Sequence, residues 1–532
     1  MMRPKRAFRT LACLLPLLLL VCRATERFGF GQEHAEAVLS RLPSDVAELL
    51  ARPRYQHARW GILAVDLASD QVLAQHNSNE LFAPASVTKL FTVAALWSRI
   101  GPDHRFRTTV YIHGELDSEG TLHGDLILYP QGDLTLGGRT LPDGTIEVTR
   151  SDHTYASGTS RTELTRTDPL QGLRRLAAVL VSAGVRRVAG DVLVDDRYFE
   201  PAQSTGSGPR KVTPVMLNDN LIDITVEPTK PGSLATVKYR PQVSGFCLDN
   251  QVRTVPGDRA TRVELRVLGP LRIQVRGSIA QGRRPVTLVY EVPDPASFAR
   301  TAFIDCLRAA GIDVPASPLD RNKPQRLPSV AERDRCQVLA ELISPPLAEE
   351  AKLVLKVSHN LHASALPILL AVHEGARDLA SGLRIEGNVL RDLGVPVDQI
   401  SLGSGAGGSR VDLVTPEATV ALLKAFYRRE DFDRFRSCLP VLGVDGTLHD
   451  MIEPDSPAVG KVFAKTGTYY LFNPLLGRHM LTAKALAGYV ETRSGRLVAF
   501  AIFVNNVDLR DLSTSGIGRD LAKIAESFHL AY

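Results

Sequence analysis

The chain has 532 residues, more than one ordinary hydrophobic core organises, so two or three domains are expected. Hydrophobic residues make up 44% and charged residues 23% of it, as in soluble globular proteins. The net charge of +5 comes from residues 1–24, which hold five basic and no acidic residues. The remaining chain has a net charge of about zero, so its charge gives no reason to expect nucleic-acid binding.

Residues 1–24 have the pattern of a secretory signal peptide. Basic residues precede an apolar run from Thr10 to Val21, and Cys22-Arg23-Ala24 offers small residues around a cleavage point. The run is shorter than the ~20 residues needed to cross a bilayer. Lipidation of Cys22 is the alternative, which the bulky Val21 disfavours. We expect a periplasmic or otherwise exported protein with no transmembrane span after signal removal.

Ser86-Val87-Thr88-Lys89 is the first motif with chemical content. Pro84 precedes helix-compatible residues and marks a helix start. Ser86 and Lys89 would then lie one turn apart on the same face. A serine hydroxyl needs a neighbouring base to act as a nucleophile, and a neutral lysine can be that base.

The middle of the chain reads as a β-rich insert, residues 107–334. Segments 108–112 and 125–129 are strand-like, 137–168 reads as an exposed polar loop, and 171–183 has helical periodicity. Residues 192–194 read as a strand, and 226–292 as several short strands in a nested unit. Ser86 and the next motif, Ser358-His359-Asn360, are 272 residues apart. If both belong to one active site, a whole domain is expected to be inserted in the chain between them.

The last third, 335–532, returns to mixed helix and strand. Helical patterns cover 299–310, 348–357 and 415–428, strands are expected at 485–490 and 497–504, and a closing helix at 521–531. Lys465-Thr466-Gly467 supplies the third motif.

Ser-x-x-Lys, Ser-x-Asn and Lys-Thr-Gly, in this order, form the signature of penicillin-binding proteins and class A β-lactamases. The chain resembles the low-molecular-mass class C penicillin-binding proteins, the D-alanyl-D-alanine carboxypeptidase/endopeptidases of peptidase family S13, of penicillin-binding protein 4 type. The long insert separates them from the β-lactamases. Further resembling segments are 122–126 with 132–136, 190–195, 344–347 and 443–448.

The resemblance implies a penicillin-recognising transpeptidase/β-lactamase-like α/β (α+β) fold. An antiparallel sheet flanked by helices would be built from residues 25–106 and 335–532. It also implies a serine-type D-Ala-D-Ala carboxypeptidase, with endopeptidase activity open, that acts on peptidoglycan stem peptides and is acylated by β-lactams. Two alternatives remain: a β-lactamase-like or esterase serine hydrolase on the same fold, and a catalytically idle cell-wall binding protein.

The motif residues receive the following expected roles. Ser86 attacks the carbonyl, Lys89 takes its proton, and Ser358 relays a proton to the leaving amine. Lys465 lowers the pKa of Lys89 as a nearby cation.

The remaining motif residues would bind the substrate. Asn360 orients Lys89 or holds a substrate amide, and Lys465 with Thr466 faces the terminal carboxylate. Gly467 lets backbone approach backbone. Backbone N–H groups of Ser86 and Thr468 would form the oxyanion hole.

Other residues are expected to be structural. No metal or cofactor is expected, because His359 and His362 lack metal-ligand spacing and fit core or surface roles better. Cys247, Cys306, Cys336 and Cys438 read as thiols without a disulfide framework. The glycine-rich segment 403–410 departs from the family at Gly403, where aspartate is usual, and is expected to be a flexible loop. Segment 469–484 is expected to be a lengthened turn, whose apolar part, 469–478, is hypothesised to be a lip over the cleft.

Overall fold

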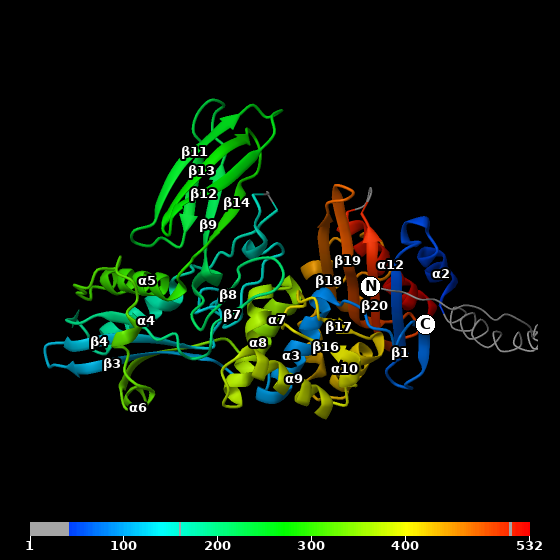
Figure 1. Ribbon diagram of the computed structural model, residues 1–532, viewed down its shortest axis with the longest axis horizontal. Helices are drawn as coiled ribbons and strands as arrows, with labels where there is room; N and C mark the ends of the chain where they lie inside the picture. The colour runs from blue at the N-terminus through cyan, green and yellow to red at the C-terminus, as the bar shows by residue number, and fades with distance from the viewer. Residues whose placement is uncertain (1–41, 159–160, 510–512) are drawn as a thin grey trace, which may run out of the picture.

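The computed structural model describes residues 42–158, 161–509 and 513–532. Its central element is a five-stranded antiparallel sheet in the order β18-β19-β20-β1-β2. Two strands come from the start of the described chain, β1 (Arg59–Asp66) and β2 (Val72–His76). Three come from the end, β18 (Val462–Asn473), β19 (Arg478–Glu491) and β20 (Leu497–Asp508). The predicted sheet built from both ends of the chain is therefore confirmed (Figure 1).

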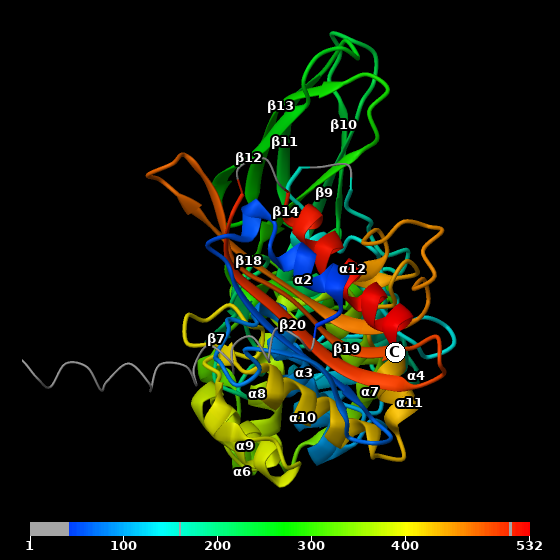
Figure 2. The same ribbon diagram turned by 90° about the vertical axis from the view of Figure 1, so that its right-hand side faces the viewer.

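Helices cover both faces of this sheet (Figures 1 and 2). One layer contains α3 (Thr88–Ile100), α7 (Leu347–Val357), α8 (Asn360–His373), α9 (Leu379–Asp392), α10 (Pro416–Tyr427) and α11 (Phe432–Ser437). The opposite face carries α2 (Ser44–Leu50) and α12 (Thr514–Ala531). Strands β1 and β20 are buried along almost their whole length because apolar clusters lie on both sides of them.

The insert forms a separate body with its own apolar core. Its first sheet contains β3 (Arg107–Leu116), β4 (Thr121–Gln131), β5 (Arg187–Val188), β6 (Val192–Val194) and β15 (Gln337–Ile343). Helices α4 (Gln171–Ser182) and α5 (Pro295–Ala309) pack against this sheet. Because β15 pairs with β3, we propose that the insert ends near residue 343 instead of 334.

The nested β-rich unit consists of two three-stranded sheets, which project upward in Figure 1. One contains β9 (Leu221–Glu227), β10 (Thr236–Arg240) and β14 (Val286–Glu291), and the other β11 (Cys247–Val255), β12 (Arg262–Gly269) and β13 (Arg272–Ala280). The short elements are α6 (Val330–Arg333), β7 (Ala202–Gln203), β8 (Lys211–Val212), β16 (Ile400–Ser401) and β17 (Leu413–Val414).

Two expectations about loops were wrong. Within the described part of segment 137–168, Arg139, Asp152, His153 and Thr154 are buried, so this part is not an exposed loop throughout. Their polar character misled the prediction, since each finds a charged or hydrogen-bonding partner inside the protein. Segment 469–484 is not a lengthened turn but an extension of β18 and β19 into a hairpin, with only residues 474–477 between the strands.

The remaining predictions about local features have mixed outcomes. The predicted signal peptide, including Cys22, lies outside the described residues. Within the described ranges, no helix combines the length and apolarity needed to span a membrane. The four remaining cysteines are free thiols, with Cys306 and Cys438 buried.

Candidate active site

Ser86 and Lys89 lie side by side at the start of α3. Ser86 belongs to the 3-10 turn Ala85–Val87 that runs directly into the helix. The Lys89 Nζ atom lies 2.8 Å from Ser86 Oγ, so the predicted proximity of the two side chains is confirmed. Lys89 is fully buried, whereas Ser86 is half-buried and accessible to a substrate.

The surroundings of Lys89 favour a neutral amine. Its Nζ also lies 2.7 Å from Asn360 Oδ1 and 2.8 Å from the Ala406 carbonyl oxygen. A neutral amine donates two hydrogens to these two oxygens and keeps its lone pair for the Ser86 hydroxyl proton. Burial holds the pKa of Lys89 well below its ordinary value, and the nearby Lys465 lowers this pKa further, as predicted.

Ser358 and Asn360 enter the site from the junction of α7 and α8. Ser358 caps the C-terminus of α7 in the left-handed conformation, with φ 68°. Its Oγ accepts a hydrogen bond of 2.8 Å from Lys465 Nζ. Asn360 is the first residue of α8 and accepts from Lys89 through its side-chain oxygen. Of the two expected roles for Asn360, this contact supports the orientation of Lys89.

Strand β18 forms the third wall and approaches the Ser86 turn very closely. A Cβ atom on Gly467 would lie 2.4 Å from the Pro84 carbonyl oxygen, so only glycine fits this position. Thr466 Oγ1 donates to Thr447 Oγ1 at 2.7 Å. Burial and the charge of Lys484 lower the pKa of Lys465 to about 7.

Sequence reasoning missed several residues of the site. Lys484, opposite Thr468 on β19, donates to Thr468 Oγ1 at 2.7 Å. Ala406 supplies a carbonyl to Lys89, and Gly407 packs so closely that its Cβ would lie 1.9 Å from the Ala85 carbonyl oxygen. The run of glycines at 403–408 was the available signal. The segment is a loop without helix or strand, as expected, and it lies against the catalytic turn with Gly405 and Ala406 buried.

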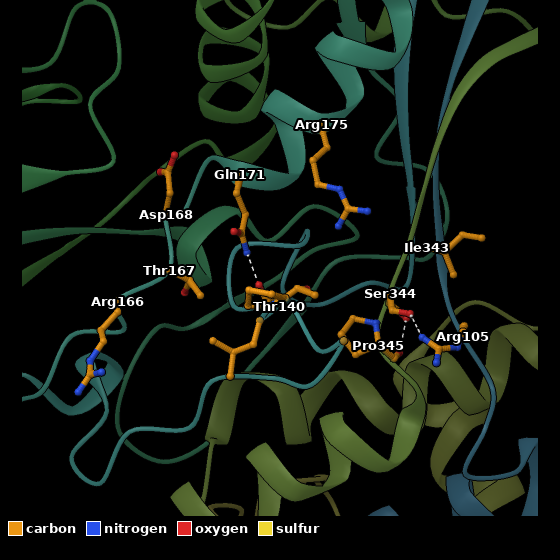
Figure 3. Close-up of a pocket in the computed structure, with 13 residues that line it drawn as sticks. Arg105, Thr140, Arg166, Thr167, Asp168, Gln171, Arg175, Ile343, Ser344 and Pro345 are labelled. Atoms are coloured by element: carbon orange, nitrogen blue, oxygen red, sulfur yellow. Dashed lines mark hydrogen bonds between the residues drawn. The ribbon is translucent and has the colours of Figure 1, made fainter.

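Ser86 opens into a cavity of about 340 Å³. The cavity is lined by Ser86, Gly206, Ser207, Asn360, Ala406, Gly407, Gly408, Thr468, Tyr469 and Tyr470. A larger cavity of about 760 Å³ lies elsewhere, where Arg105 and Pro345 face the start of α4 (Figure 3). That cavity contains no motif residue. We therefore take the smaller cavity as the candidate active site, because Ser86 and Asn360 line it.

A group of buried ionisable residues lies behind Ser358. The side chains of Asp219, His359 and His362 are close enough to hold a metal ion, as are those of Asp152, His153 and Asp219. Both ring nitrogens of His362, however, already face carboxylates at 2.6 and 2.7 Å. The carboxylates around it hold the pKa of His362 at about 10, so protons fill these positions at neutral pH. His359 and His362 therefore have core roles, one of the two expected possibilities.

Comparisons with known proteins agree with this geometry. A sequence profile of the D-Ala-D-Ala carboxypeptidase 3 (S13) family matches residues 42–525. The chain is 29% identical to a D-alanyl-D-alanine carboxypeptidase of Actinomadura sp. (strain R39) over 88% of this chain and 82% of that protein. It is 25% identical to the D-alanyl-D-alanine carboxypeptidase DacB of Haemophilus influenzae over 85% and 87% of the two chains.

The fold is similar to the crystal structure of penicillin binding protein 4 (dacB) from Haemophilus influenzae. The TM-score is 0.65 at 21% identity, covering 93% of this chain and 99% of that one. The three motifs also meet in space, because Lys89 contacts Ser86 and Asn360 while Lys465 contacts Ser358. With the profile match spanning nearly the whole described chain, the protein belongs to the S13 family of D-Ala-D-Ala carboxypeptidases.

Proposed function

We propose that this chain is an exported serine D-Ala-D-Ala carboxypeptidase that acts on peptidoglycan stem peptides through an acyl-enzyme on Ser86. The observation that carries the proposal is the environment of Lys89, a buried amine with its remaining hydrogen-bonding direction toward Ser86 Oγ. The basic and apolar pattern of residues 1–24 supports export to the periplasm or beyond.

Acylation then proceeds as follows. Ser86 Oγ bonds to the carbonyl carbon between two D-alanines while its proton passes to the Lys89 amine. The amide bond breaks, and the terminal D-alanine leaves after its nitrogen takes a proton, which we assign to Ser358. Lys465, hydrogen-bonded to Ser358 Oγ, can restore that proton. Water then adds to the ester carbonyl and gives a proton that restores Lys465, the proton on Lys89 returns to Ser86 Oγ as the ester bond breaks, and the shortened peptide is released.

Substrate binding would use β18. The protonated amine of Lys465 and the hydroxyl of Thr466 suit the terminal carboxylate of the peptide. The backbone N–H groups of Ser86 and Thr468 are assigned to the oxyanion, and both residues line the same cavity. Gly467 keeps β18 against the Ser86 turn, which supports the close spacing of these groups.

β-Lactams should acylate the same serine. A solved structure of the Haemophilus influenzae penicillin binding protein 4 is a complex with a β-lactam. The test is labelling of the purified protein with a fluorescent penicillin, together with D-alanine release from a peptide ending in D-Ala-D-Ala. Stable labelling that disappears in Ser86→Ala is the expected result. Rapid turnover of the label would favour a β-lactamase, and no label and no release would favour an idle binding protein.

A further inference from the structure

A buried ionic cluster joins the insert to the helical layer behind the active site. It is centred on Asp219, whose carboxylate accepts hydrogen bonds from Arg139 at 2.8 Å, His153 at 2.7 Å and His362 at 2.6 Å. We call it the Asp219 cluster; its members are Arg139, Asp152, His153, Asp219, Asp223, Glu350, His359 and His362. All are at most 6% exposed.

The negative charges of the Asp219 cluster are offset by its own cationic groups together with the neighbouring Arg240. The carboxylates around them raise the pKa values of His153 and His362 to about 10, so both rings are cationic at neutral pH. Together with Arg139 and Arg240 they offset the four carboxylates, because Arg240 also pairs with Asp223.

His359 is held neutral inside the same cluster. Its Nδ1 atom accepts the backbone N–H of His362, which places a hydrogen on its Nε2 atom. That atom lies 3.4 Å from Asp219 Oδ1. Burial and the charge of His362 lower the pKa of His359, in agreement with a neutral ring. The hydrogen bonds that Arg139, His153 and His362 donate to Asp219 hold these members in one arrangement.

The cluster reaches the catalytic residues by two short routes. Asp152 caps the 3-10 turn His153–Tyr155, and the Tyr155 hydroxyl donates to the Ser358 carbonyl oxygen at 2.5 Å. His359 lies between Ser358 and Asn360 in the chain and caps α8. In addition, the Asn360 amide donates to the carbonyl oxygen of Ser207 in the insert at 2.9 Å.

Ser358 needs such support because of its backbone. A residue with a side chain rarely adopts a φ of 68°, and it stays there only when its surroundings impose it. In this conformation its Oγ meets Lys465, while Asn360 meets Lys89. A rotation about this backbone would therefore disturb both lysine contacts.

We propose that Tyr155, anchored through the Asp219 cluster, is a positioning residue for acylation that holds Ser358 against Lys465. The insert, which contains Tyr155, then supports the acylation step itself and not only the choice of substrate. This inference rests on the proposed function, since its readout is the acylation of Ser86.

The test is Tyr155→Phe, which removes one hydroxyl and leaves the ring. The matched control is Tyr290→Phe on β14, whose hydroxyl also donates to a backbone carbonyl, that of Pro270, within the insert. Both variants lose one hydrogen bond of ordinary strength. We expect the acylation rate constant for penicillin to fall about three- to tenfold in Tyr155→Phe, with initial binding unchanged, and to stay at the wild-type value in Tyr290→Phe.

A second comparison separates positioning from general destabilisation. In a Ser358→Ala background the Tyr155 hydroxyl has no Ser358 Oγ left to position, so adding Tyr155→Phe should lower acylation much less than it does in the wild type. Equal losses in both backgrounds, or equal losses in Tyr155→Phe and Tyr290→Phe, would overturn the inference. A wild-type protein that penicillin does not label at Ser86 would refute the proposed function and this inference with it. A labelled wild type with unchanged acylation in Tyr155→Phe refutes the inference alone.

Discussion

Replacing Lys89 by arginine keeps a cation at the centre of the site but removes its ability to act as a base. The structure places Lys89 Nζ at hydrogen-bond distance from Ser86 Oγ, and burial together with Lys465 lowers the Lys89 pKa. A guanidinium has a pKa above about 12 and stays protonated at pH 7, so fewer than about one molecule in 10⁵ would carry a free base. The loss is limited by routes through water, and general-base catalysis is worth about 10²- to 10⁴-fold. We therefore expect acylation of Lys89→Arg to fall by about three powers of ten.

The assay is the rate of covalent labelling of Ser86 by a fluorescent penicillin, followed by mass spectrometry of the intact protein. Lys424→Arg is the control, because this lysine pairs with Asp70 on the outside of α10 and its replacement keeps that ion pair. Lys89→Met, which removes base and charge together, should be as inactive as Lys89→Arg. Acylation of Lys89→Arg within about tenfold of the wild type, with Lys89→Met inactive, would show that the charge matters and would refute the general-base role.

Three further results are expected. First, kcat/KM for a peptide with a free terminal carboxylate should fall as the pH rises above about 7, because Lys465 then loses the proton that attracts this carboxylate; the amidated peptide should lack this fall. Second, Gly467→Ala should slow acylation more than tenfold and lower the free energy of unfolding by about 1–3 kcal/mol, because the added Cβ would collide with the Pro84 carbonyl oxygen. The control is Gly387→Ala, where the added Cβ meets open space, and it should change neither quantity. Acylation rates and thermal unfolding of both variants check this. Third, trimming residues 471–476 should change the relative rates on different muropeptides and leave penicillin acylation and the melting temperature nearly constant. The reason is that Phe472 and Leu475 are 58% and 89% exposed and so contribute little to the packed core. A joint loss of acylation rate and stability would show that the hairpin has a structural role instead.

Local patterns predicted the elements that carry the chemistry. The helix start at Pro84 and the spacing of Ser86 and Lys89 predicted their contact, because a helix brings residues three apart onto one face. Helix α4, strand β6 and the last two strands of the central sheet agree with periodicity and β-branched content. Gly467 was correctly assigned to a close backbone approach, for which only glycine has room.

Polar residues that are buried through long-range pairing escaped prediction. Arg139 and Asp152 lie in a stretch that composition marks as exposed, and their burial depends on Asp219 and His362, which are distant in the sequence. No local pattern reports such a pairing, since each charge is tolerated inside only when its partner is present. Lys484 escaped for the same reason, because it meets Thr468 only through the register of β18 and β19.

Buried basic groups have carboxylate partners in the Asp219 cluster and hydroxyl partners in the active site. This difference explains why one enzyme contains both. In the cluster, Arg139, His153 and His362 face carboxylates, which fixes their protons and their positions. In the site, the amines of Lys89, Lys465 and Lys484 each contact a hydroxyl, whereas Lys356, Lys424 and Lys461 pair with carboxylates. A carboxylate partner would hold each amine protonated, and a hydroxyl partner leaves burial free to lower its pKa. Amines whose protonation changes during the reaction are poor anchors, because burying them without a carboxylate partner costs stability. The network of paired charges around Asp219, next to Ser358, can supply the fixed geometry that the lysines cannot provide for themselves.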